Sequence, residues 1–247
     1  MPKRVPTGDD TVNPVRRRPA SRGAKLAREI GIIVVGVLLA LAAQQTVDAI
    51  SWRQKAEAAE RVMSDELSRN LTFAAERGAM QPCVDRYLAR LEQAVLASDA
   101  ATVRRLAAME RPFRPRPWRT TSWDATLSTQ VADHLDSARL GRYALVFTSI
   151  AAQRDRQFAI SEGFVEALSG RFGFRSDAES MRLQLVAIDK LRQELRLSAL
   201  IAQQLLDESR EGLGVEPGER WVSDSQVRAQ RCERSLAGLE RTAPGGR

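Results

Sequence analysis

The sequence has 247 residues, with 38 Lys or Arg against 31 Asp or Glu and a formal net charge of +7. Residues 1–28 contain eight Lys or Arg and two Asp, so this short segment has a net charge of +6 and the remainder of the chain only +1. A nucleic-acid-binding domain is expected to present its basic residues on a folded face. The charge distribution therefore argues against specific nucleic-acid binding, and leaves only salt-sensitive binding by the tail as an alternative.

The basic segment at the N-terminus is rich in Pro, Gly, Asp and Asn and has no apolar periodicity. Such a composition cannot bury enough apolar surface to fold. We predict that residues 1–24 form a disordered cytoplasmic tail, and we expect the same of the short segment 242–247.

An apolar run follows the tail and is the strongest feature of the sequence. Residues 30–47 include eighteen positions without a charge, a helix of roughly 27 Å at about 1.5 Å per residue, close to the ~30 Å hydrocarbon core of a bilayer. We predict a transmembrane helix over residues 25–50, with the lipid bilayer as its partner. Gly36, Ala40 and Ala43 form a stripe of small residues, which is typical of membrane helices that pack closely against each other.

Two other interpretations of the apolar run remain open. A basic segment, an apolar stretch and the small residues Ala40 and Ala42 also describe a signal peptide that is cleaved. The n-region would be unusually long, however, and helix-forming sequence continues directly beyond the run. A buried core helix is the other alternative, and the isolated position of the run near one end argues against it.

The distribution of Lys and Arg around the apolar run predicts its orientation. Residues 10–29 contain six of them, whereas residues 48–67 contain three with acidic residues between them. Because the more basic flank stays in the cytoplasm, we expect a bacterial inner-membrane protein with a cytoplasmic N-terminus and a periplasmic C-terminal domain, residues 51–241.

Only two cysteines occur, Cys83 and Cys232, and both belong to the part predicted to be exported. An even number of cysteines in an oxidising compartment favours a disulfide. We therefore predict a bond between them, the alternative being two unrelated thiols on separate helices.

The exported part has apolar residues at helical spacing throughout and no strand-like alternation, so we predict an all-α fold with a helical bundle. One helix is expected to begin near residues 21–25 and to continue through the membrane to Gly78. Pro82 should open the next helix, because proline suits a first turn. Further helices are predicted to begin at Asp99, at Ser122, at Asp136 or Ser137, at the capping box of Ser176 with Glu179, and at that of Ser223 with Gln226.

Residues 29–41 read EIGIIVVGVLLAL, and Trp52-Arg53 follow after a further stretch containing Ala and Gln. This pattern resembles a group of uncharacterised single-pass bacterial membrane proteins over roughly residues 25–70. The resemblance implies a short basic N-terminus, one membrane helix and a helical extracytoplasmic part. It implies no activity.

The single histidine is the main catalytic candidate. His134 lies between Asp133 and Asp136, and an imidazole beside carboxylates can transfer protons. The sequence has no HExxH, GxSxG, P-loop or GxGxxG motif, and no Cys and His spacing typical of zinc. We therefore favour a histidine at a helix end, and predict no catalytic, metal or cofactor site.

A Pro- and Arg-rich stretch at residues 111–123 is the better candidate for binding. Arg114, Arg116, Trp118 and Trp123 are of the types enriched where proteins bind partners, and an anionic partner would suit the arginines. The alternative is a connector whose tryptophans are buried at one end of the bundle.

The sequence thus predicts a single-pass inner-membrane protein whose helical periplasmic domain mediates protein interaction, self-association or sensing without catalysis. The alternative is a membrane-tethered helical domain that binds a ligand or acts as an enzyme.

Overall fold

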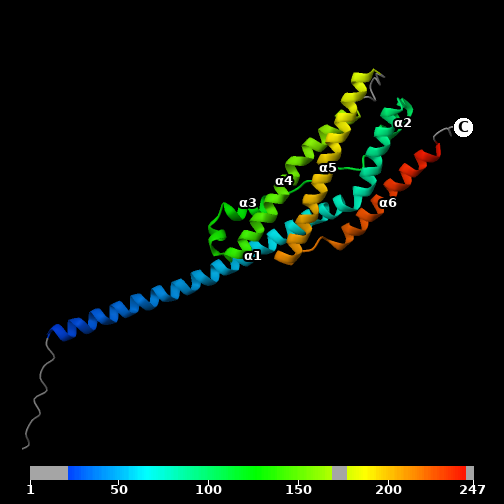
Figure 1. Ribbon diagram of the computed structural model, residues 1–247. Helices are drawn as coiled ribbons and strands as arrows, with labels where there is room; N and C mark the ends of the chain where they lie inside the picture. Colours follow the sequence, from blue (N-terminus) through cyan, green and yellow to red (C-terminus); the bar gives the residue numbers. More distant parts are fainter. Residues whose placement is uncertain (1–21, 169–176, 243–247) are drawn as a thin grey trace, which may run out of the picture. The chain divides into compact units, whose positions relative to one another are not determined.

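A computed structural model describes residues 22–168 and 177–242, and helices account for almost all of them (Figure 1). No β-strand occurs in these two ranges, which confirms the all-α class. The order of elements is α1 (Arg22–Leu96), α2 (Ala100–Ala108), α3 (Thr121–Leu127), the 3₁₀-helix η1 (Gln130–His134), α4 (Ser137–Ala167), α5 (Ala178–Leu213) and α6 (Glu219–Thr242).

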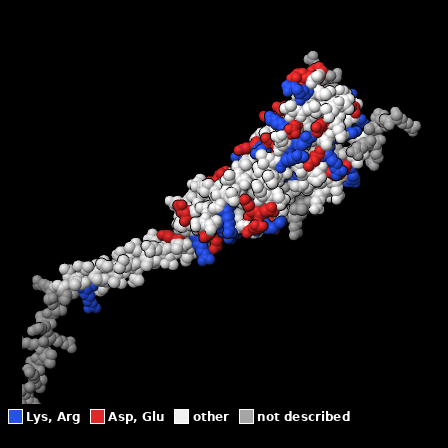
Figure 2. Space-filling model, viewed as in Figure 1, with Lys and Arg blue, Asp and Glu red and all other residues white. Residues whose placement is uncertain are grey.

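The chain divides into two compact units at the junction of Ser51 and Trp52, and α1 contributes to both. In the first unit, the described residues are the N-terminal part of α1. Among the described residues, α1 is the one helix that is long and apolar enough to cross a membrane. The side chains of its N-terminal part are uncovered, with Ile32 64% and Leu39 66% exposed, and Figure 2 shows basic side chains near the start of this part followed by a long uncharged stretch.

The second unit is a bundle in which the C-terminal part of α1 packs with α4, α5 and α6. Two apolar clusters fill it. One is centred on Leu88 and Leu91 of α1 and includes residues from α2, α4, α5 and α6. The other is centred on Leu67 and Leu71 and includes Trp118 with residues from α4 and α5. The helical bundle predicted for this part of the chain is therefore present.

The sequence predicted that Pro82 would open a helix. Pro82 instead lies inside α1. A proline in this position lacks the N–H that would bind the carbonyl of Gly78, and its ring crowds that carbonyl, which costs about 3 kcal/mol. The apolar positions keep one register across it, from Leu71 and Ala74 to Val84 and Leu88, all buried. This continuous burial outweighs the local penalty, because tertiary packing overrides helix propensity.

The helix starts were predicted with mixed success. Asp99 and Asp136 cap α2 and α4 as expected, and their side chains accept hydrogen bonds from the backbone N–H groups of Thr102 and Arg139. The cap of α5 is Asp177, whose side chain accepts from the Ser180 N–H, whereas the predicted cap, residue 176, lies outside the described residues.

Two other predicted starts were wrong. Residue Ser223 lies inside α6, which begins four positions earlier at Glu219. Ser122 lies inside α3, and the helix predicted to begin at this serine is instead the short α3 followed by η1. The backbone N–H and hydroxyl of Ser122 both donate to the Glu66 carboxylate on α1, so this serine is held by a tertiary contact and caps nothing. Of the tails predicted at residues 1–24 and 242–247, residues 1–21 and 243–247 lie outside the described residues, whereas residues 22–24 belong to α1 and Thr242 to α6.

The α4 and α5 helices pack closely along their length (Figure 1). Gly163 provides the closest approach, since a Cβ there would lie 3.2 Å from Leu191 Cδ1. A buried polar pair crosses the same interface: Gln153 donates to the Ser198 carbonyl at 2.6 Å and accepts from the Ser198 hydroxyl at 2.8 Å. Because both groups are satisfied, the pair fixes the register of the two helices without an unpaired buried group.

Candidate functional site

The connector between α2 and α3, residues 109–120, contains the stretch that the sequence marks for binding. Its prolines exclude a helix, so its backbone groups need partners from elsewhere. The Asn70 side chain binds both backbone groups of Arg119, donating to its carbonyl at 2.8 Å and accepting from its N–H at 3.1 Å. Gln157 of α4 accepts from the Arg116 N–H at 2.9 Å. Side chains of α1 and α4 therefore fix the path of the connector.

The two tryptophans of this stretch point into the bundle. Trp118 is 4% exposed and meets the ring of Phe73 edge to face, with centroids 5.7 Å apart. Trp123 is half-buried and stacks on Phe147 at 5.6 Å. Both rings thus pack in or against the cluster centred on Leu67 and Leu71. They contribute apolar area to the domain, in agreement with the alternative that this stretch is a connector with buried tryptophans.

The two arginines of the same stretch lie at the surface instead. Arg114 forms an ion pair with Glu110, and half of its side chain is exposed. Arg116 is a quarter exposed and reaches α1, where its Nε lies 2.7 Å and its Nη2 2.6 Å from Glu76 Oε2. The structure therefore separates the four predicted residues into two core tryptophans and two surface arginines.

Glu76 is the centre of an ionic cluster that joins three parts of the chain. It is only 6% exposed. Its second carboxylate oxygen, Oε1, pairs with Arg228 of α6. A carboxylate paired through each of its oxygens is well compensated for the loss of water. Glu76 thus holds a guanidinium group of the connector and one of α6 at one point on α1.

A third arginine lies beneath these two. Arg77 is 8% exposed, its guanidinium carbon lies 3.6 Å from the centre of the Phe113 ring, and it donates to the Arg114 carbonyl at 3.0 Å. Its pKa is lowered from 12.5 to about 9, mainly because the side chain is buried; the charge of Glu76 opposes this change, and the charges of Arg116 and Arg228 add to it. The group is still charged at neutral pH, so the cluster contains three cations around one anion.

Two adjoining hollows open beside this cluster, between the connector, α1 and α6. One has a volume of about 340 Å³ and the other of about 260 Å³. Both are lined by Arg114, Arg228 and Arg231; Arg116 lines the larger one and Arg111 the smaller. We call these five residues the arginine groove. Arginine presents a planar fork of donors that matches carboxylate and phosphate oxygens.

Most of this site could not be predicted from the sequence. Arg114 and Arg116 are in the predicted stretch, but Glu76 is 38 positions before Arg114 and Arg228 is 112 positions after Arg116. Glu76 is one acidic residue in a helix with a polar face, and Arg228 lies in a helix that contains many arginines. Only the folding of α6 onto α1 brings them together.

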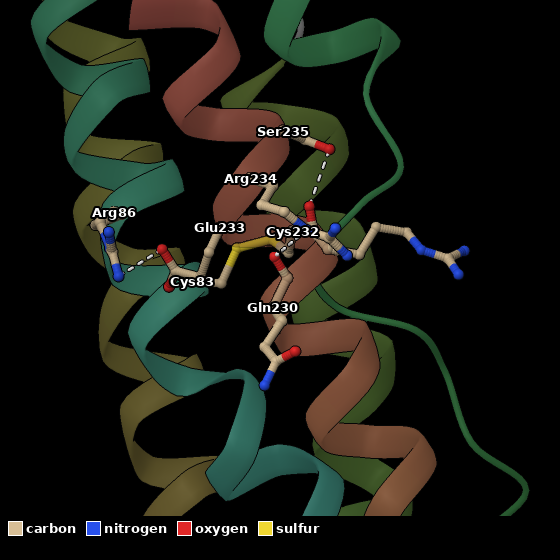
Figure 3. Close-up of a disulfide and its surroundings, with 8 residues drawn as sticks. Cys83, Arg86, Gln230, Cys232, Glu233, Arg234 and Ser235 are labelled. Carbon is tan, nitrogen blue, oxygen red and sulfur yellow. Dashed lines mark hydrogen bonds and ion pairs between the residues drawn. A yellow bond between two sulfur atoms is a disulfide. The ribbon is translucent and has the colours of Figure 1, made fainter.

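A disulfide joins α6 to α1, as predicted (Figure 3). Cys83 and Cys232 have Cα atoms 6.2 Å apart, and Cys83 is fully buried. An ion pair between Arg86 and Glu233 lies beside the bond, and Cys232 lines the smaller hollow. The disulfide therefore fixes the wall of the arginine groove that α6 supplies.

His134 lies apart from the groove, exposed at the end of η1. Its ring stacks on Trp52 with centroids 4.3 Å apart, and Lys55 lies 4.2 Å from the centre of the same Trp52 ring. The described residues contain no group of three or more His, Cys, Asp or Glu side chains able to hold a metal ion. The observed role of His134 is thus an aromatic contact at a helix end.

The predicted packing stripe of the membrane segment, Gly36, Ala40 and Ala43, lies on the uncovered part of α1. A Cβ at Gly36 would meet nothing within 4 Å. Space for a second helix is therefore present, and helix association at this stripe stays a prediction.

No protein-family model, curated protein or solved structure matches this chain.

Proposed function

We propose that the chain is a single-pass protein of the bacterial inner membrane whose helical domain, residues 52–242, lies in the periplasm and mediates interaction or sensing. The disulfide between Cys83 and Cys232 carries this proposal. Disulfides persist in oxidising compartments and are rare in the cytosol. The uncovered apolar helix and the excess of basic residues before it support the same topology, because basic flanks remain in the cytoplasm.

The resemblance of residues 25–70 to single-pass bacterial membrane proteins supports the bacterial source. A signal received by the helical domain would pass to another protein or to a second copy through the membrane helix. The small residues Gly36, Ala40 and Ala43 suit such a helix contact.

The topology is tested by alkylating thiols in intact cells, before and after reduction, and reading the mass shift. We expect no modification of Cys83 or Cys232 without reductant and modification of both after it. Two thiols that react only after lysis, without any reduction, would place the domain in the cytoplasm and overturn the proposal. The partner is tested by cross-linking in cells, and the absence of any captured protein or second copy would exclude the interaction role.

A second candidate is a tethered domain that binds a small ligand. The ionic cluster at Glu76 favours it, because two arginines bind one carboxylate, with Arg77 close by, beside two open hollows. A purely structural ion pair needs only one cation for one anion.

A further inference from the structure

We propose that the arginine groove binds a small, multiply charged oxyanion, with two or more carboxylate or phosphate groups, between the connector and α6. This inference deepens the proposed sensing function by naming the class of ligand. The arrangement of charges around the two hollows carries it.

The arginines outnumber the acids in both hollows, and two of the three acids are already paired with arginines. The larger hollow has Arg114, Arg116, Arg228 and Arg231 against Glu76 and Asp224. The smaller has Arg111, Arg114, Arg228 and Arg231 against Glu110. Glu76 is bound by Arg116 and Arg228, and Glu110 by Arg114.

Two of the arginines have no ion-pair partner among the described residues. Arg111 and Arg231 are exposed and face the smaller hollow from the connector and from α6. Arg231 also lines the larger hollow. Their charges thus come from two different elements that line one hollow, and one anion with two charged groups would bind both.

Glu76 has a positioning role in this arrangement. By holding Arg116 and Arg228 through separate oxygens, it fixes two guanidinium groups that would otherwise repel each other, and it leaves further N–H donors on each. A site assembled before its ligand arrives loses less entropy on binding. The size of the hollows suits a small molecule or one end of a larger one, and excludes a folded protein surface.

The site also depends on α6. Among the α6 side chains described, only Ser225 and Leu236 are buried, so apolar contact alone holds this helix weakly. The disulfide therefore keeps Arg228 and Arg231 opposite the connector, and reduction should weaken anion binding.

The test uses the full chain in nanodiscs of phosphatidylcholine, titrated with pyrophosphate or citrate at constant ionic strength and followed by calorimetry. Arg111→Gln and Arg231→Gln remove the arginines that lack ion pairs and should leave the fold intact. Each is expected to weaken binding about tenfold, since charged hydrogen bonds are lost. Arg104→Gln is the matched control, because Arg104 is exposed on α2 and away from both hollows.

Absence of binding by the oxidised chain to either anion would overturn the proposal, as would an equal loss in Arg104→Gln. A free anion and the headgroup of cardiolipin, which carries two phosphates, share this chemistry, and cardiolipin in the nanodiscs separates them. Competition by this lipid assigns the site to a headgroup, and unchanged titration assigns it to a soluble anion. Because purified protein is used, a failure here leaves the topology and partner experiments unaffected.

Discussion

The carboxylate of Glu66 accepts two hydrogen bonds from Ser122, from its backbone N–H at 3.1 Å and from its hydroxyl at 3.0 Å. Glu66 is 6% exposed and Ser122 9%, so the contact is buried although it joins residues 56 positions apart. It attaches the first turn of α3 to α1 and sets where the connector ends.

Replacing Glu66 by alanine should lower the free energy of unfolding by about 2–3 kcal/mol, because a buried N–H and a buried hydroxyl lose a charged acceptor. Glu66→Gln keeps one acceptor oxygen and should lose about half as much. Urea unfolding followed by circular dichroism measures both. Glu162→Ala, at an exposed site on α4, is the control and should change stability by no more than about 0.5 kcal/mol. Equal losses at residues 66 and 162 would contradict this role.

The same contact illustrates which elements the sequence could predict. Asp99 and Asp136 are capping residues that bind the backbone three positions ahead, and such local geometry is readable from sequence. Ser122 has the same local features as these caps, but a distant carboxylate binds it. Pro82 is similarly misleading, since the burial that keeps α1 intact comes from other helices. Sequence rules therefore predicted helix ends that neighbouring residues determine. They failed where contacts with distant residues determine where a helix begins or continues.

Gly163 should tolerate no side chain larger than a methyl group. Gly163→Val would push at least one further methyl group into Leu191, whose Cδ1 already lies 3.2 Å from the Cβ position, and should cost about 1–3 kcal/mol. Gly141, on the same helix, has nothing within 4 Å. Gly141→Ala should therefore stabilise the protein by about 0.5–1 kcal/mol through helix propensity. Thermal unfolding of both variants in parallel checks the opposite signs.

Loss of the disulfide should destabilise the domain strongly. A loop closed across 149 positions corresponds to about 4–5 kcal/mol in the chain-entropy model. The double variant Cys83→Ala with Cys232→Ala should unfold at lower urea concentration, and limited proteolysis should cut first between α5 and α6. A wild-type chain treated with reductant should reproduce both results. Unchanged proteolysis would mean that apolar contacts alone hold α6.

Ionisation of the Tyr87 phenol should make the free energy of unfolding depend on pH in the alkaline range. Burial raises the pKa of its phenol from 10.0 to about 12, so the unfolded chain ionises first and binds fewer protons. Stability contributed by the neutral phenol is complete below pH 10 and falls as pH rises toward 12. Tyr87→Phe should remove this slope. At neutral pH it should lose about 1 kcal/mol with the hydrogen bond to the Leu106 carbonyl. Urea titrations at pH 7 and pH 11 distinguish the two effects.

The candidate site was predictable only in part, for a related physical reason. The alternation of Pro and Arg around Arg114 marked the connector, because prolines exclude helix whatever the surroundings. That Trp118 is buried while Arg116 is at the surface follows from how α1 and α4 hold the backbone, through Asn70 and Gln157. The opposite wall belongs to α6, and no local pattern predicts which helix Arg228 faces.

The bond between Cys83 and Cys232 imposes an order on the synthesis of the protein. The ribosome makes Cys83 first, and its only partner within the sequence follows 149 positions later. The thiol must wait while α2 to α5 are made, and with two cysteines in the sequence no wrong pairing within the chain exists. The remaining incorrect disulfides are those between this chain and other molecules. A chain interrupted before α6 would carry a single thiol, which could form a disulfide only with another molecule.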